Sequence, residues 1–533
     1  MDPHLHVATA WERVAELRPD APATIAGADV RSWAEFETRA ARLSAGLVAA
    51  GAGVDSKVAH YLYNGHEYLE TTFAAFKMRG VPCNVNFRYT PHELAYVLDN
   101  ADAEVVVFDH TLADRLDEAR HQVDSLKLLV QVGGDDVPGW AVGYEELIAG
   151  HDPATPGTRS VDDHWFLYTG GTTGMPKAVM WSQGTIFGSM EATVRSFGFG
   201  YPRSMDDIEG IVVTAAERGH EVRQLAAAPL MHGTSMIVAF GTLTHGGAVA
   251  CLEERHFNGH ELWQRVAEHR ITQLTIVGDA FSRPMLDALA EADHDTSSLR
   301  SIVSSGVMWS AEVKERILDH LPDVVLLDAL GSSEGPGMAN QLSSRKLERS
   351  GTTARFSLGE HTTVFTDEGE EVQPGSGDVG RIALGFPIPV GYYKDPAKTE
   401  ETFPLIQGRR WSIPGDYASV EADGTITLLG RGSVCINTGG EKVFPEEVEE
   451  ALKTHDQVID ANVVGLADER WGQSVNAVVS TNGAVDVDDL RAHLRELLAG
   501  YKIPKRMVVV DEVQRQPNGK ADYPWARSVL GAE

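Results

Sequence analysis

Residues 57–108 decide the fold class, and they read KVAHYLYNGHEYLETTFAAFKMRGVPCNVNFRYTPHELAYVLDNADAEVVVF. Short apolar, β-prone runs at 57–61, 81–85 and 104–108 alternate with runs of helical periodicity at 66–78 and 91–100. Strands that alternate with helices in this way predict parallel sheets covered by helices. The same alternation returns between residues 262 and 328, so we expect a large α/β unit.

The texture of the chain changes after residue 356. The segments TVFTDEGEEVQPG (363–375) and YASVEADGTITLLG (417–430) are short alternating runs around Glu-Gly and Asp-Gly turns, which predict antiparallel hairpins. From residue 445 onward, helical and β-prone runs follow one another in the manner of a small α+β domain. We place the boundary at Arg431–Ser433, which gives an N-terminal domain of residues 1–431 and a C-terminal domain of residues 432–533.

The charge balance limits the partners of the protein. Acidic residues outnumber basic ones by 77 to 46, and the formal net charge is −31. Binding to nucleic acid or to an anionic membrane surface needs a basic face, so we exclude nucleic acid. The N-terminus lacks the features of a signal peptide, and no run reaches the roughly 18 apolar residues of a membrane span. We therefore expect a cytoplasmic protein without integral membrane association, and a homodimer is compatible with the sequence.

The three cysteines indicate no covalent or metal framework. Cys83, Cys251 and Cys435 are far apart in the chain and lie in no CxxC or Cys/His ligand spacing. This arrangement predicts reduced thiols rather than a disulfide or a zinc site.

A glycine-rich loop is the first candidate for chemistry. Residues 168–179, YTGGTTGMPKAV, have β-prone flanks and therefore predict a strand–loop–strand arrangement. Backbone N–H groups and hydroxyls in such a loop can form an anion-binding nest, to which Lys177 adds a charge. The loop is not a P-loop, because Met175 and Pro176 separate Gly174 from the lysine. A flexible Gly/Thr hairpin turn without function is the alternative.

Seven further segments follow this loop in order. They are APLMHG (228–233), SSGVMW (304–309), DALGSSEG (328–335), GRIALGFPIPVGYYKDP (380–396), IPGDY (413–417), LGRGSVCINTGGEKVFPEEVE (429–449) and QPNGKADY (516–523). Taken singly, each has an ordinary structural explanation, such as a core histidine or a solvated turn lysine. Their occurrence in one order along nearly the whole chain resembles the adenylate-forming superfamily, which includes acyl-CoA synthetases, peptide-synthetase adenylation domains and luciferases.

The resemblance implies a fold and a nucleotide site. The large domain would also contain a distorted antiparallel barrel, and the small C-terminal domain would be mobile. The phosphate loop would comprise Thr169, Gly170, Gly171, Thr172, Thr173, Gly174 and Lys177. Gly306 would lie against adenine, Ser333 at the α-phosphate, and Glu334 would hold Mg²⁺. Asp416 would bind the ribose hydroxyls, and Arg431 the ribose or a phosphate.

The same resemblance implies the catalytic groups and a two-step reaction. Glu334, as the Mg²⁺ ligand, would act with His232 beside the acyl pocket and with Lys520, which would bridge the substrate carboxylate and the α-phosphate. Carboxylate and ATP would give acyl-AMP and pyrophosphate. The small domain would then rotate about Arg431–Ser433, and coenzyme A would bind along Gly439, Gly440 and Glu441 to accept the acyl group.

Three positions depart from the family pattern. Leu330 stands where an aromatic residue is usual, Arg381 where a glutamate is usual, and Ser433 where the hinge usually carries Asp or Lys.

The composition of single segments and the likeness to known ligases narrow the class of carboxylic acid that the protein would activate. The segment PLMHGTSM (229–236) has no acidic residue to pair with an α-amine, which disfavours amino acids. Apolar or small residues at Gly278, Val307 and Leu330, together with a likeness to actinobacterial ligases, favour a medium- or long-chain fatty acid or a steroid side-chain carboxylate. An aryl-acid CoA ligase, an acyl-AMP ligase with another acceptor, and a catalytically silent nucleotide-binding scaffold remain alternatives.

Overall fold

The structure is a computed structural model. It describes residues 5–169, 175–190, 202–307, 309–346, 355–438, 441–468, 472–498, 500–516 and 519–531. Within them, no helix is long and apolar enough to cross a membrane.

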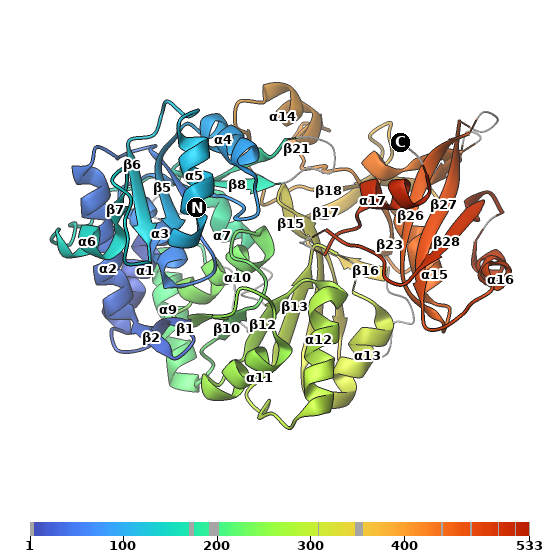
Figure 1. Cartoon of the computed structure of the whole chain (residues 1–533), viewed down its shortest axis with the longest axis horizontal. Coiled ribbons are helices and arrows are strands. Elements are labelled where there is room, and N and C mark those ends of the chain that lie inside the picture. Colours follow the sequence, from blue (N-terminus) through green and yellow to red (C-terminus); the bar gives the residue numbers. More distant parts are fainter. Residues whose placement is uncertain are drawn as a thin grey trace.

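Two sheets form the body of the large N-terminal part (Figure 1). The larger sheet is half parallel, from β1 to β14, and half antiparallel, from β15 to β17. In spatial order its strands are β17 (Thr362–Phe365), β18 (Val379–Leu384), β22 (Asp416–Val420), β23 (Thr425–Arg431), β16 (Arg355–Leu358), β15 (Gly335–Ser343), β14 (Val325–Ser332), β13 (Ser301–Ser305), β12 (Gln273–Ile276), β10 (Arg223–Ala226), β11 (Ala248–Cys251), β1 (Pro22–Ala26) and β2 (Asp29–Ser32).

The smaller of these two sheets contains the segment quoted above. Its strands, in spatial order, are β19 (Gly391–Tyr392), β9 (Lys177–Ser182), β8 (His164–Thr169), β4 (Val81–Asn84), β3 (Lys57–Tyr61), β5 (Ala103–Asp109), β6 (Leu128–Val132) and β7 (Val142–Gly143). Strands β3, β4 and β5 are parallel, as predicted. Strands β8 and β9 pair antiparallel on either side of the glycine-rich loop, which confirms the strand–loop–strand prediction.

Helices fill the space between the two sheets. Trp11 lies at the centre of this layer, in ring contact with Phe36, Phe73 and Phe240 from three other helices. Burial of aromatic rings and of aliphatic side chains from both sheets stabilises the layer. The helices associated with it are α1 (Val7–Leu17), α2 (Trp33–Ala49), α3 (His66–Lys77), α6 (Tyr144–Ala149), α7 (Gln183–Ser189), α9 (Met205–Arg218) and α10 (Gly233–Thr244).

Other helices cover the outer faces of the sheets. Helices α4 (Pro91–Asn100) and α5 (Ala113–Arg120) pack on the smaller sheet, and α11 (Gly259–Glu268), α12 (Gly278–Glu291) and α13 (Ala311–His320) pack on the parallel half of the larger one. Helix α4 begins with Pro91 after a Thr90–Glu93 capping box, which satisfies N–H groups of the first turn. Helix α14 (Pro396–Thr402) and the hairpin β20 (Leu405–Ile406) and β21 (Arg409–Arg410) lie at one rim.

The expected distorted antiparallel barrel is not found as a closed barrel among the described residues. Strand β17 is an edge strand of the large sheet, and among the described strands it pairs only with β18. The antiparallel half curls enough for Met338 of β15 and Ile382 of β18 to share one core. Hairpin turns fix local pairing, but closure requires an additional pairing between distant strands.

The C-terminal part is α+β, as predicted. Its sheet comprises β24 (Ile436–Thr438), β25 (Glu441–Val443), β26 (Val458–Asp468), β27 (Gly472–Thr481) and β28 (Arg506–Val510). Helices α15 (Pro445–Lys453) and α16 (Val487–Leu497) share one core with the sheet, and α17 (Tyr523–Val529) belongs to a second one. A 3₁₀ turn, Gly432–Val434, joins β23 to this part, and the domain boundary at Arg431–Ser433 stays a prediction.

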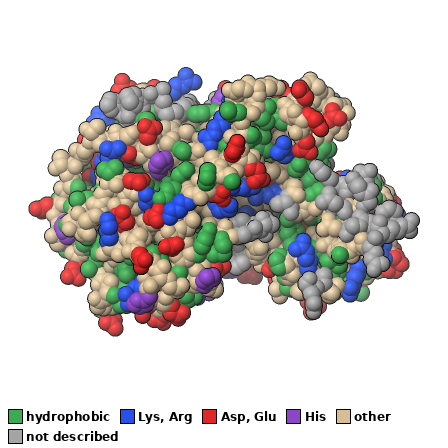
Figure 2. Space-filling view, turned by 90° about the horizontal axis from the view of Figure 1, so that it is seen from above, with side chains coloured by type: hydrophobic (Ala, Val, Ile, Leu, Met, Phe, Trp, Pro, Cys, Tyr) green, Lys and Arg blue, Asp and Glu red, His purple; other side chains and the backbone are tan. Residues whose placement is uncertain are grey.

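Charged side chains of both signs lie on the surface. On the face seen in Figure 2, acidic and basic side chains are interspersed rather than gathered by sign. Cys83 and Cys251 are buried free thiols, and burial raises the pKa of Cys251 to about 12.

Candidate active site

A cavity of about 2080 Å³ lies where the antiparallel half of the large sheet, the ends of its parallel strands and the C-terminal part meet. Ligand sites in α/β proteins characteristically lie at the carboxyl ends of parallel strands. Predicted residues from very different parts of the chain line this cavity, namely Thr169, His232, Gly306, Ser333, Glu334, Asp416, Arg431 and Lys520.

Glu334 lies in the tight connection between β14 and β15, where Ser332 and Gly335 are paired. Its backbone carbonyl accepts a hydrogen bond from Ser412 Oγ at 2.6 Å, and its carboxylate oxygen Oε1 accepts one from Tyr392 Oη at 2.7 Å. The carboxylate is thus held by a strand of the smaller sheet, β19. Burial together with Glu334 raises the pKa of Tyr392 above its usual value. The sequence alone did not indicate this role for Tyr392.

Asp416 and Arg431 face each other across two antiparallel strands. Asp416 opens β22, Arg431 ends β23, and the two residues are register partners. Arg431 Nε lies 3.2 Å from Asp416 Oδ1. The carboxylate of Asp416 is the main reason why the pKa of Arg431 is raised. The pair offers an acceptor and a planar donor side by side, which suits a vicinal diol next to a phosphate.

Lys520 reaches the cavity from the C-terminal part on a turn closed by Gln516 N–H and the Lys520 carbonyl at 2.8 Å. Gly519 has a φ of +81°, and a Cβ at this position would lie 3.7 Å from atoms of Val277 and Ala280. The turn therefore packs against the loop after β12. Burial, followed by the positive charge of Arg431, lowers the pKa of Lys520, whereas Glu334 and Asp416 act in the opposite direction.

His232 is the N-cap residue of α10 and is partly buried. Burial, and after it the charge of Lys520, lowers its pKa to about 4, so the ring is neutral at physiological pH. Its Nε2 is buried without a hydrogen-bond partner in the described part of the chain. A neutral ring with an unsatisfied nitrogen beside the cavity is suited to contact a polar substrate group.

Two asparagines that the sequence analysis missed hold the segment before His232. Asn84 Nδ2 donates to the carbonyls of Tyr168 at 2.9 Å and Met231 at 2.7 Å, and Asn84 Oδ1 accepts from Tyr168 N–H at 2.6 Å. Asn64 Nδ2 donates to the Ala228 carbonyl at 3.2 Å. Asn84 therefore connects the strand that leads into the glycine-rich loop with the residue before His232. A polar Asn inside the apolar run VPCNV was the only signal for it.

Not every predicted residue lies on the cavity. Lys177, the register partner of Thr169, forms an ion pair with Asp395, the N-cap of α14, and is not among the lining residues. Glu441 is the first residue of β25, and its side chain lies outside the described part of the structure. Gly170, Gly171, Thr172, Thr173, Gly174, Gly439 and Gly440 lie outside the described residues.

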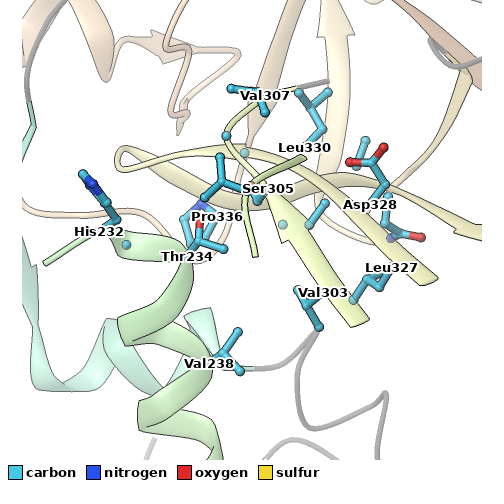
Figure 3. Close-up of a pocket in the computed structure, with 18 of the residues that line it drawn as sticks. His232, Thr234, Val238, Val303, Ser305, Val307, Leu327, Asp328, Leu330 and Pro336 are labelled. Atoms are coloured by element: carbon cyan, nitrogen blue, oxygen red, sulfur yellow. The ribbon is translucent and has the colours of Figure 1, made fainter. Parts of the chain in front are cut away.

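One end of the cavity is an apolar recess between α10 and the inner face of the large sheet (Figure 3). Val303 and Leu327 are neighbours on β13 and β14, and Val238 on α10 lies across from them. Val307 and Leu330 line the cavity as predicted, and Gly278 lies between the lining residues Val277 and Asp279. Arg381, which departs from the family pattern, pairs with Asp367 at 3.3 Å and is not among the lining residues.

The fold and this site define a nucleotide-dependent enzyme of two parts, both of which contribute residues to one cavity. The AMP-binding enzyme family matches residues 11–393, and the AMP-binding enzyme C-terminal domain matches residues 447–520. The chain belongs to the AMP-binding enzyme family, which confirms the resemblance stated above.

Individual relatives are similar over their whole length. The chain is 40% identical to a 3-oxocholest-4-en-26-oate–CoA ligase of Rhodococcus rhodochrous, covering 99% of this chain and 96% of the relative. It is 39% identical to a medium/long-chain-fatty-acid–CoA/3-oxocholest-4-en-26-oate–CoA ligase of Mycolicibacterium smegmatis, covering 98% and 96%. The crystal structure of an anthranilate CoA ligase in complex with anthranoyl-AMP has the same fold, with a TM-score of 0.83 at 20% identity, covering 100% of this chain and 98% of that one.

Proposed function

We propose that this protein is an ATP-dependent acyl-CoA synthetase acting on a bulky hydrophobic carboxylic acid. The observation that carries the proposal is the convergence of Lys520 with Glu334, Asp416 and Arg431 on one cavity that continues into an apolar recess. A site of this kind joins cationic and anionic groups for a nucleotide with an apolar compartment for the acid.

In the first half-reaction, the carboxylate of the acid attacks the α-phosphorus of ATP and pyrophosphate leaves. Two anions must approach, so charge neutralisation and alignment supply most of the catalysis. Lys520 lines the same cavity, and its ammonium group would contact both the carboxylate and the α-phosphate. Asp416 and Arg431 would hold the ribose, and Ser333 would donate to a phosphate oxygen.

A magnesium ion fits this site only with help from the substrate. The described residues contain no group of three or more His, Cys, Asp or Glu side chains that could hold a metal ion alone. Mg²⁺ bound with nucleotide needs only one or two protein carboxylates, and Glu334, oriented by Tyr392, supplies one. When bound, Mg²⁺ would neutralise phosphate charge.

In the second half-reaction, the small domain of residues 432–533 would rotate relative to residues 1–431. Lys520 would leave the cavity, and the segment with Gly439, Gly440 and Glu441 would approach the pantetheine arm of coenzyme A. The 3₁₀ turn Gly432–Val434, which contains Ser433, is the short connection that supports a hinge at this point.

The acid is proposed from the recess and from the names of the relatives. The walls of the recess are formed by Val238, Val303, Leu327 and Leu330. These apolar side chains suit a fatty acid or a steroid side-chain carboxylate better than a polar acid. The relatives at 40% and 39% identity are named for such acids. We retain a cytoplasmic location and a homodimer as predictions.

The test is an incubation with ATP, Mg²⁺ and a panel of fatty, steroid side-chain and aryl acids, with and without CoA, followed by mass spectrometry. We expect acyl-CoA from the bulky hydrophobic acids, formed only when CoA is present. Thioester only from aryl acids would replace the substrate class, and acyl-AMP without thioester would indicate another acceptor. Absence of any adenylate across the panel would contradict the proposal and favour a silent scaffold.

A further inference from the structure

The cavity does not end at the apolar recess. Its lining continues along β13 through Ser305, Val303 and Ser301, and along β14 through Ala329, Leu327 and Val325. Alternate residues of a strand point to the same face, so these six side chains form one continuous wall. Four residue steps from Ser305 to Ser301 correspond to about 13 Å at roughly 3.3 Å per residue. The groove therefore extends to the opposite ends of the parallel strands.

One face of α10 accompanies this wall. Thr234, Ile237 and Val238 line the cavity, and their spacing of three and four residues places them on the same side of the helix. The middle of the groove is therefore apolar on two sides. It offers nothing to a charged group until its far end.

The far end is basic. Arg223, Arg270 and Arg300 line it, at or just before the first residues of β10, β12 and β13. Thr272 connects two of them, because its N–H donates to the Arg223 carbonyl at 2.9 Å and its carbonyl accepts from Arg300 N–H at 2.8 Å. Strands β10 and β13 lie on either side of β12, so the backbones of Arg223 and Arg300 are about 10 Å apart, which two long side chains can span.

These arginines are in no ion pair with the acidic residues that the structure describes, although Arg270 acts electrostatically on Asp295. Within the described ranges none of them forms an ion pair, although the chain has 77 acidic and 46 basic residues. The acids that line this end are engaged elsewhere, since Glu221 pairs with Arg18 and Asp323 lies 3.6 Å from Lys346. Arg223 Nη1 donates to the His269 carbonyl at 2.9 Å. Arg300 Nη1 donates to the carbonyls of Ser297 at 2.7 Å and Leu299 at 3.0 Å. A guanidinium carries five N–H donors, so the remaining donors of each side chain keep capacity for a further acceptor.

We infer that Arg223 and Arg300 form a distal subsite for an oxygen acceptor, a ketone or a carboxylate, at the far end of the hydrophobic acid. The inference rests on the proposed function and deepens it. The substrate class is then a long hydrophobic acid with an oxygen function remote from the reacting carboxylate. Acids whose body is shorter than the groove cannot reach the arginines and gain nothing from them.

The test compares matched acids with the full-length protein. One pair is a long-chain dicarboxylic acid and the monocarboxylic acid of equal length, and the other is 3-oxocholest-4-en-26-oate and the same acid without the ketone. We expect the oxygen-bearing member of each pair to have a kcat/KM at least about tenfold higher, because a hydrogen bond to a charged donor is typically worth that much. A shorter dicarboxylic acid should show no such preference.

The variants are Arg223→Gln and Arg300→Gln, with Arg316→Gln on the outer face of α13 as the matched control. Arg300 is exposed, so its substitution should leave folding intact, and thermal unfolding of each variant checks this. We expect either substitution to reduce the preference about tenfold, mainly through KM, since the contact is remote from the reacting carboxylate. The control should keep the preference.

The outcomes separate this inference from the proposed function. Equal preference in all three variants, or no preference in the unaltered protein, would overturn the distal subsite while leaving acyl-CoA synthesis in place. Failure to activate any acid would instead contradict the proposed function. Arginine variants that alter binding to anionic lipid vesicles but not the substrate preference would assign these arginines to a membrane surface, and this result too would overturn the subsite.

Discussion

Replacement of Tyr392 by phenylalanine removes one oxygen atom and with it the 2.7 Å hydrogen bond to Glu334 Oε1. The ring remains, so its contact with Phe403, with centroids 5.7 Å apart, and the pairing of β19 with β9 should persist. A hydrogen bond to a charged group is worth roughly 1.5–3 kcal/mol. Loss of this orientation should therefore reduce adenylation about 10- to 100-fold at limiting Mg²⁺.

The assay is pyrophosphate release over a series of MgCl₂ concentrations, with a saturating hydrophobic acid. We expect Tyr392→Phe to require more Mg²⁺ for half-maximal rate, because the carboxylate that would hold the ion is no longer fixed. Tyr393→Phe is the matched control, since the neighbouring hydroxyl donates to Asp102 at 2.7 Å, away from the cavity. Identical Mg²⁺ dependence in the two variants would refute the idea that Tyr392 orients a metal ligand.

Three further predictions concern the cavity and the hinge. Lys520→Ala should lower the rate of adenylation at least about 10²- to 10³-fold, which is the scale for loss of a transition-state donor. Lys505→Ala, at the surface of the C-terminal part, should not lower it. A near-normal adenylation rate in Lys520→Ala would show that Lys520 is not catalytic. Ser433→Pro should slow thioester formation more than adenylation when the two half-reactions are timed separately, and equal losses would count against the hinge. The pKa of His232 lies near 4 and below its value in the unfolded chain, so the unfolded state binds more protons between pH 6.5 and 4 and stability falls as the pH is lowered. Chemical unfolding at pH 7 and pH 5 should therefore show that His232→Gln loses about 2 kcal/mol less than the unaltered protein, and an equal loss would contradict the neutral buried ring.

Much of the fold could be predicted because it depends on local patterns. The runs at 57–108 form strands and helices almost at the predicted bounds, since each has a clear period and helix α4 has a strong start signal at Thr90–Glu93. The barrel could not be predicted in the same way. Each hairpin follows from its turn, but whether β17 meets another edge depends on how strongly the whole sheet curls.

The residues of the candidate site also divide into those that could be predicted from the sequence and those that could not. Residues such as Asp416 and Lys520 stand in recognisable segments, and the structure brings them to one cavity. Asn84 and Tyr392 act through partners far away in sequence, such as Met231 and Glu334. Nothing in their immediate neighbours indicates those partners, because only the packing of β4 and β19 beside the cavity creates them.

The walls of the apolar groove and Lys520 come from different parts of the sequence, and this matters for chimaeras made from related chains. The apolar groove is formed by α10, β13 and β14, all of which precede Arg431, whereas Lys520 is carried by a turn near the end of the chain. We therefore expect the choice of acid and the timing of the two half-reactions to depend on separate parts of the chain. A chimaera that takes its final hundred or so residues from a relative should show the relative's rates for the two half-reactions. It should keep this chain's preference for acids.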